Sequence, residues 1–175
     1  QQVRVEQLGV GPGGQRQPEV VQQSPSSRRH FEHDGVQVEI LGTDESVYLI
    51  SGGGGNSLAI VDDDSGGVVL IDTKLPGWGK TVADAINLVT DLPVTTLINT
   101  HAHEDHTGSN DEFKTATQIV AHENTAAAMA RTGRQAAERP NRTFTDRMTL
   151  LEGENRIDLY YFGAGHTAGD LVVVF

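Results

Sequence analysis

The chain has 175 residues, the length of one domain, and its 37% hydrophobic content is enough for a buried core. Thirteen basic and twenty-four acidic residues give a net charge of −11, which argues against nucleic acid or an anionic membrane surface as a partner. The lack of cysteine excludes disulfides and thiolate metal sites, and no apolar run reaches the roughly 18 residues that a transmembrane helix needs.

Residues 1–34 are predicted to form a flexible arm, because they are rich in glutamine, glycine and proline and show no sustained hydrophobic period. The chain begins with Gln1 rather than with methionine, and loss of a secretory signal is the ordinary reason for such a start. We therefore expect an exported protein, periplasmic or secreted. A cloned or proteolysed fragment would begin in the same way, so that alternative stays open.

Residues 35–175 are predicted to form the folded domain. Short apolar runs bounded by turn residues predict β-strands. These runs are VQVEILG (36–42), SVYLIS (46–51), SLAIVDD (57–63) and GVVLIDT (67–73). The segment GGGGNS (52–57) separates two of them and is predicted to be a hairpin loop, since it lacks the lysine and helix spacing of a phosphate-binding loop.

A helix is expected next, over residues 79–91, because Val82, Ala85, Ile86 and Val89 fall on one stripe of it. The run VTTLINT (94–100) then predicts a buried strand. The order strand, helix, strand implies a parallel crossover, and ligands of such sheets gather at the carboxyl ends of the strands.

The stretch INTHAHEDHTGSN (98–110) lies at such an end and holds four side chains of the metal-ligating kind. His101 and His103 are one residue apart in an extended segment, so they project the same way and can share one ion. Asp105 and His106 come a turn later and point to a neighbouring position. Imidazole and carboxylate without thiolate suit zinc, and also iron or manganese.

A second patch, YYFGAGHTAGD (160–170), places His166 just after a predicted strand and between glycines that allow tight turns. A lone histidine in such a place is more often structural. Beside the histidine-rich loop, His166 becomes the expected next ligand.

The combination of THAHEDHTG, GHTAGD about sixty residues later and VVLIDT upstream resembles the metallo-beta-lactamase superfamily, from about Val36 to the end of the chain. The resemblance implies an α/β (α+β) fold, the four-layer αβ/βα sandwich with metals at one edge of two facing sheets. It implies that His101, His103 and His166 hold the first metal and that Asp105 and His106 contribute to the second. Asp72 matches the buried aspartate that supports the metal loop through hydrogen bonds. Asn110 ends a DHTGGN-like stretch in which Ser109 replaces the second glycine.

The chain resembles roughly the first half of that fold, truncated at its carboxyl end. The bridging aspartate and the last histidine that the family uses for the second metal are not found before Phe175. We therefore expect a second polypeptide, or the missing carboxyl-terminal half, to cover residues 156–175.

The resemblance implies a zinc-dependent hydrolase with two ions in the complete site, in which a metal-bound hydroxide attacks the carbonyl of a beta-lactam, lactone, ester or similar substrate. Asp105 would orient the nucleophile and pass a proton to the leaving group. Two alternatives remain: an iron-dependent sulfur dioxygenase of the same superfamily, and a non-catalytic half-fold subunit of a larger assembly.

Overall fold

The structure is a computed structural model that describes residues 30–41 and 45–175. Most of the predicted arm, residues 1–29, lies outside the described residues. His30–His33, at the end of that arm, form a strand of the main sheet.

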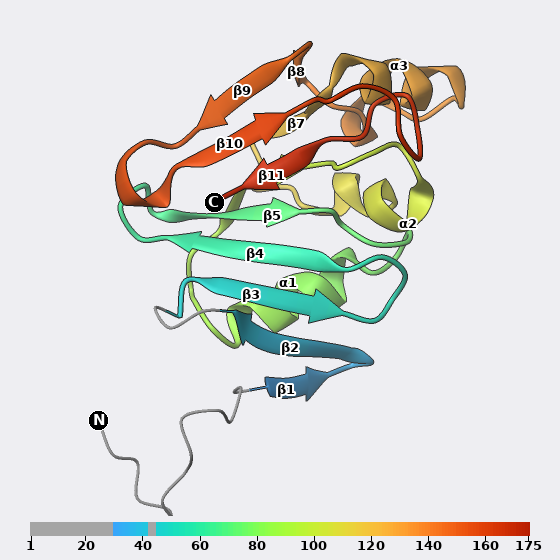
Figure 1. The fold of residues 1–175 in the computed structure, drawn as a ribbon. Coiled ribbons are helices and arrows are strands. Elements are labelled where there is room, and N and C mark those ends of the chain that lie inside the picture. Colours follow the sequence, from blue (N-terminus) through green and yellow to red (C-terminus); the bar gives the residue numbers. More distant parts are fainter. Residues whose placement is uncertain (1–29, 42–44) are drawn as a thin grey trace, which may run out of the picture.

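Two sheets make up the strand content of the described chain (Figure 1). The main sheet contains β1 (His30–His33), β2 (Val36–Leu41), β3 (Val47–Ser51), β4 (Ser57–Asp62), β5 (Gly67–Ile71), β6 (Val94–Ile98), β7 (Gln118–His122) and β8 (Arg142–Phe144) in that order. The small sheet has the order β11 (Val172–Val174), β10 (Ile157–Tyr160), β9 (Arg147–Leu150). The helices are α1 (Gly79–Asn87), α2 (Glu104–Thr107) and α3 (Glu123–Arg131), with short 3-10 turns η1 (Asn110–Glu112), η2 (Ala136–Glu138) and η3 (Gly153–Asn155).

The pairing of neighbouring strands in the main sheet changes once, from antiparallel to parallel. Strands β1 to β5 are antiparallel neighbours, and β5 to β8 are parallel. The change falls where α1 connects β5 to β6, which confirms the predicted parallel crossover. The predicted hairpin loop at residues 52–57 also joins two antiparallel strands, β3 and β4.

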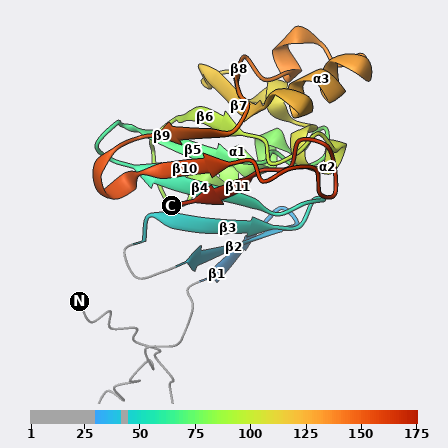
Figure 2. The ribbon, with the colours of Figure 1, turned by 45° about the horizontal axis from the view of Figure 1, so that its top comes forward.

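The main sheet is covered on both faces. Helix α1 lies behind it, and the small sheet lies across its other face (Figures 1 and 2). Strand β5 is buried at every position because its side chains alternate between the two layers. Val68 and Leu70 join the cluster under α1, whereas Val69 and Ile71 join the cluster between the sheets. Burial of each such side chain contributes about 2 kcal/mol.

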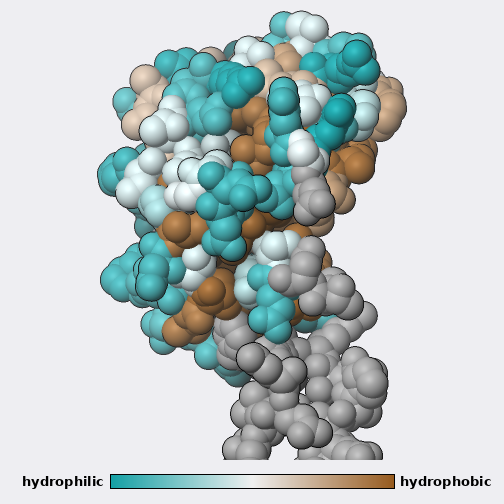
Figure 3. Space-filling model, turned by 90° about the vertical axis from the view of Figure 1, so that its left-hand side faces the viewer, coloured by the Kyte–Doolittle hydropathy of each residue, from teal (hydrophilic) through white to brown (hydrophobic). Residues whose placement is uncertain are grey.

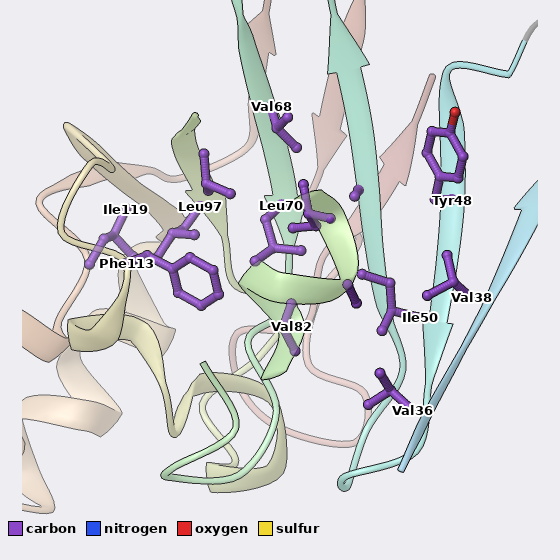
Figure 4. Close-up of a cluster of buried hydrophobic side chains, with 14 residues drawn as sticks. Val36, Val38, Tyr48, Ile50, Val68, Leu70, Val82, Leu97, Phe113 and Ile119 are labelled. Atoms are coloured by element: carbon purple, nitrogen blue, oxygen red, sulfur yellow. The ribbon is translucent and has the colours of Figure 1, made fainter. Parts of the chain in front are cut away.

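The apolar stripe predicted for the helix is the face of α1 that packs against the main sheet. Val82, Ala85 and Ile86 are buried against the main sheet, and Val89 packs at the edge of the same cluster. Figure 4 shows Val82 of α1 in the same buried cluster as Leu70 and Ile50 of the sheet. The fold is therefore the mixed α/β arrangement that the sequence predicts.

Large hydrophobic side chains also reach the surface. Over the side that lies to the left in Figure 1, they emerge between hydrophilic groups (Figure 3). Val172 and Val174 of β11 are about half exposed, and Phe162 is 79% exposed. Among the described residues, no helix is long and apolar enough to span a membrane.

Candidate metal centre

The side chains of the motif stand at the carboxyl end of β6, where the crossover argument placed them. His101 lies three residues after the end of β6 at Ile98, and His103 is the residue before the first turn of α2. Asp105 and His106 lie within α2 itself. The chain bends at residues 100–102 after β6, and α2 begins directly after His103 and carries the other two residues.

Three imidazoles converge on one point. His101 Nε2 is 3.2 Å from His103 Nδ1, and His166 Nε2 is 3.0 Å from the same atom. The rings of His101 and His166 each stand nearly perpendicular to the ring of His103, so the nitrogens rather than the ring faces meet. A tetrahedral zinc ion bound at 2.0 to 2.1 Å would hold nitrogens about 3.3 Å apart. The donor set and its spacing therefore fit a metal ion.

His166 reaches the cluster because its loop is fastened to neighbouring elements. Thr125 Oγ1 and Asn124 Nδ2, in the first turn of α3, donate to the carbonyls of Gly169 and Ala168 at 2.9 and 2.8 Å. The amide of Leu171 donates to the carbonyl of Thr100, one residue before His101, at 3.0 Å. This last bond ties the loop of the small sheet to the turn after β6.

Asp105 and His106 form a second pair beside the cluster. His106 Nε2 is 3.4 Å from Asp105 Oδ2, and the rings of His106 and His101 have centroids 4.2 Å apart. Two donors at this separation fit one edge of a metal coordination shell and leave the rest of that shell open.

Asp72 supports both groups, as its position in the sequence predicted for the metal loop. Its carboxylate is buried, with an exposed fraction of 3%, and accepts hydrogen bonds from the Thr100 amide at 2.8 Å and the Thr100 hydroxyl at 2.7 Å. It also lies 2.6 Å from His106 Nδ1. A carboxylate on the outer nitrogen of a histidine fixes its tautomer and leaves Nε2 free as a donor to a metal.

Two imidazoles differ in their electrostatic setting. The hydrogen bond to Asp72 raises the pKa of His106 above its usual value. Burial lowers the pKa of His101, and the neighbouring His106 adds to this effect. A lowered pKa favours the neutral form of His101, which is the form that binds metals.

Three supporting residues were not predicted from the sequence. Ser109, which stands where the related stretch has glycine, donates to the Leu75 carbonyl at 2.6 Å and accepts from the Trp78 amide at 3.1 Å. Arg134 donates to Thr107 Oγ1 of α2 at 3.1 Å. Both therefore fix the turn that carries Asp105 and His106.

The third unpredicted residue is Lys74, a lysine with no exposed surface. Its ammonium donates to the carbonyls of Ile50 and Gly55 at 2.9 and 2.7 Å. Burial lowers its pKa to about 8, and the nearby Asp72 carboxylate opposes that change.

Asn110 and His122 serve the fold. Asn110 Oδ1 accepts from Thr73 Oγ1 at 2.8 Å and from the side chain of Asn99 at 3.0 Å, which locks the end of the metal loop to its neighbours. His122 caps α3 by accepting from the Asn124 amide at 3.2 Å, and its ring stacks on Tyr161 with centroids 3.7 Å apart. His122 therefore has a structural role.

Comparison with solved structures shows the same fold. A metallo-beta-lactamase from Pontibacter korlensis matches with a TM-score of 0.61 and 24% identity, over 85% of this chain and 66% of that chain. The DIM-1 metallo-beta-lactamase exposed to ceftazidime matches with a TM-score of 0.62 and 21% identity, over 82% of this chain and 66% of that chain. The chain thus spans 66% of the length of each of these structures.

Sequence comparison agrees. The 2,4-dinitroanisole O-demethylase subunit alpha of Nocardioides sp. (strain JS1661) is 36% identical over 85 residues, which are 47% of this chain and 26% of that protein. The chain therefore spans about a quarter of the length of this curated relative. The family model of the metallo-beta-lactamase superfamily matches residues 50–175, which include the whole of the cluster described above. The chain belongs to the metallo-beta-lactamase superfamily.

Proposed function

We propose that the chain carries the catalytic metal loop of a zinc-dependent hydrolase, with His101, His103 and His166 as ligands of the first ion. The observation that carries the proposal is the approach of three imidazole nitrogens to one another, all within 4.8 Å. Superfamily membership supports a metallohydrolase-type enzyme. Histidine donors in a chain without cysteine favour zinc, with iron or manganese as the other candidates.

A second ion would lie beside Asp105 and His106. The free Nε2 of His106 faces the Asp105 carboxylate, and Asp72 holds the outer nitrogen of the same ring. This is the arrangement in which a supporting carboxylate orients a metal-binding histidine. The remaining ligands of this position, an aspartate and a histidine, would come from a further polypeptide segment.

Bound zinc would supply a hydroxide nucleophile at neutral pH, because it lowers the pKa of water to about 7. Side chains of this chain would then orient the nucleophile relative to the substrate. Asp105, on the first turn of α2, presents a carboxylate 3.4 Å from His106 Nε2 and can hold the nucleophile in line with a substrate carbonyl. The same carboxylate can accept a proton and pass it to the leaving group. Beta-lactams, lactones and esters are the substrate class that this chemistry suits.

The exposed edge at β11 supports a partner. Strand β11 is at the end of the small sheet, and Val172, Val174 and Phe175 are each about half exposed. Open edges and exposed apolar side chains favour pairing with another strand. We propose that a second polypeptide, or a carboxyl-terminal part of the same enzyme, covers residues 156–175. The relative from Nocardioides is itself named as a subunit, which is in keeping with such an assembly.

Metal analysis and activity assays test the function together. The native protein should contain zinc and hydrolyse at least one of a chromogenic beta-lactam, a lactone or an ester, and activity should vanish on chelation and return with zinc. One iron ion and oxygen-dependent turnover of a persulfide would instead establish a sulfur dioxygenase. A protein that binds zinc in the first position but turns over none of these substrates would favour a non-catalytic subunit.

A further inference from the structure

Lys74 joins both ends of the glycine loop, which we define as Gly52–Gly55. Ile50 lies in β3 before the loop, and Gly55 lies two residues before β4, and both carbonyls accept from the Lys74 ammonium. The lysine is wholly buried, so its charge leaves water for these two acceptors. Burial of a charged ammonium costs free energy that an exposed lysine would not cost. This cost suggests that the two bonds to the loop have a function.

The backbone that carries Lys74 is itself unusual. Asp72 and Lys74 have φ values of +60° and +66°, a region that non-glycine residues avoid. Each such residue costs on the order of 1 kcal/mol or more unless its surroundings fix it. Two bonds to the metal loop do so: the Thr73 amide donates to the His106 carbonyl at 2.7 Å, and the Gly108 amide donates to the Lys74 carbonyl at 2.8 Å. One strained turn therefore aims Asp72 at His106 and Lys74 at the glycine loop.

The glycine loop presses against the two donors of the second position. The Gly55 amide donates to the Asp105 carbonyl at 3.1 Å. A Cβ added at Gly55 would lie 2.7 Å from His106 Nε2, and one added at Gly54 would lie 3.2 Å from Asp105 Cβ. The first distance is shorter than real contacts of a Cβ, so only backbone fits beside the nitrogen that would bind the metal.

We propose that Lys74 is a positioning residue for the second metal position, because its ammonium holds the glycine loop as a fixed backbone wall against Asp105 and His106. The inference rests on the proposed function, since it assumes that these two side chains bind a metal. Lys74 touches no donor atom itself. It acts through Gly55, whose carbonyl it binds and whose amide holds the Asp105 main chain.

A buried lysine that only stabilises the core would respond differently to replacement. Its replacement would lower the stability of the whole protein and would weaken both metal positions alike. The geometry here predicts a selective effect, because the first cluster is held by other contacts: the Leu171–Thr100 backbone bond and the bonds from α3 to the loop of His166.

Cobalt(II) titration of the full chain, in the complex with its partner if one co-purifies, tests the selectivity. The wild-type protein should bind two equivalents. Lys74→Met should keep the first within about twofold of the wild-type affinity, weaken the second at least tenfold, and change the visible absorption band of the second cobalt. Lys80→Met is the matched control, since Lys80 is exposed and pairs with Asp84 on α1. Lys74→Met with two wild-type equivalents and unchanged spectra would overturn the inference.

Gly55→Ala provides a route that leaves the lysine intact and serves if Lys74→Met does not fold. Its methyl group would collide with His106, so the second equivalent should again be lost while the first is kept. Hydrogen exchange without metal adds an independent readout: the Gly55 amide should exchange at least tenfold faster in Lys74→Met, and unchanged exchange contradicts the proposed wall. A wild-type protein that binds no cobalt would contradict the proposed function, whereas one that binds a single equivalent would contradict the second position and this inference alone.

Discussion

The two groups of donors differ in how the chain builds them. The first unites His101 and His103 with His166, which is 63 positions from His103 and lies in the loop between β10 and β11 of the small sheet. The second uses two neighbours in sequence, Asp105 and His106, and depends on a strained turn and a glycine loop to place them. The first group offers three donors from this chain, and the second offers two. Long-range topology thus assembles the first group, whereas local geometry assembles the second.

Removal of His103 should break the first group most completely, because its Nδ1 lies between the nitrogens of the other two histidines. We expect His103→Ala to lower zinc affinity at the first position by a factor of at least about 10³ and to abolish hydrolysis, since a tetrahedral site with two protein ligands holds zinc poorly. Zinc content after dialysis against a weak chelator measures the effect. His33→Ala is the control, and equal zinc retention by both variants would contradict the ligand assignment.

Asp105→Asn should separate the two groups. The first ion should remain bound and the fold unchanged, while kcat should fall by about 10² to 10⁴ because the nucleophile loses its orienting carboxylate. Steady-state kinetics with the best substrate of the panel gives the value. Glu104→Gln changes the adjacent, mostly exposed carboxylate and should stay near wild type. Wild-type turnover in Asp105→Asn would remove this side chain from the mechanism.

Asp72→Asn should have a smaller and graded effect. The amide oxygen can still accept from Thr100, but the charged acceptor of His106 is lost. We expect metal affinity to fall by about 10- to 100-fold at the second position, as for other carboxylates that support a histidine ligand, and by less at the first. Competition with a chromophoric chelator resolves the two constants. Equal losses at both positions would show that Asp72 supports the loop as a whole.

Lys74 should make stability depend on pH in the alkaline range. Its pKa is about 8 in the folded chain and 10.5 in the reference state, so between these values the unfolded chain binds more protons and stability rises with pH. We expect the free energy of unfolding to increase by up to about 2 kcal/mol from pH 8 to 9.5, relative to Lys74→Met. Urea unfolding of both proteins at the two pH values measures the difference. Parallel pH profiles would mean that the ammonium is not destabilised by burial.

Local patterns in the sequence were enough to predict the main strands and α1, because alternation and the stripe of Val82, Ala85 and Ile86 depend only on neighbouring positions. The spacing of the motif likewise placed the donors at one sheet end. The contacts of Lys74, Ser109 and Arg134 could not be predicted, since their partners are 19 to 34 positions away. Nor does any periodic pattern show that two non-glycine residues after β5 take positive φ. Export of the protein and the flexible arm over residues 1–34 stay predictions, and residues 1–29 of that arm lie outside the described residues.

The contact between His166 and His103 has a consequence for the stability of the fold. An ion shared by His103 and His166 would close a loop of 63 positions, since it would link the turn after β6 to the segment between β10 and β11. A permanent link of that span restricts the unfolded chain by about 4 kcal/mol in the chain-entropy treatment of cross-links. In a chain without cysteine, zinc would therefore act as a reversible cross-link in place of a disulfide. Loss of zinc would then remove this cross-link along with the reaction, and the segment that carries β10 and β11 should become more sensitive to proteases, although the buried cluster between the sheets would still hold it.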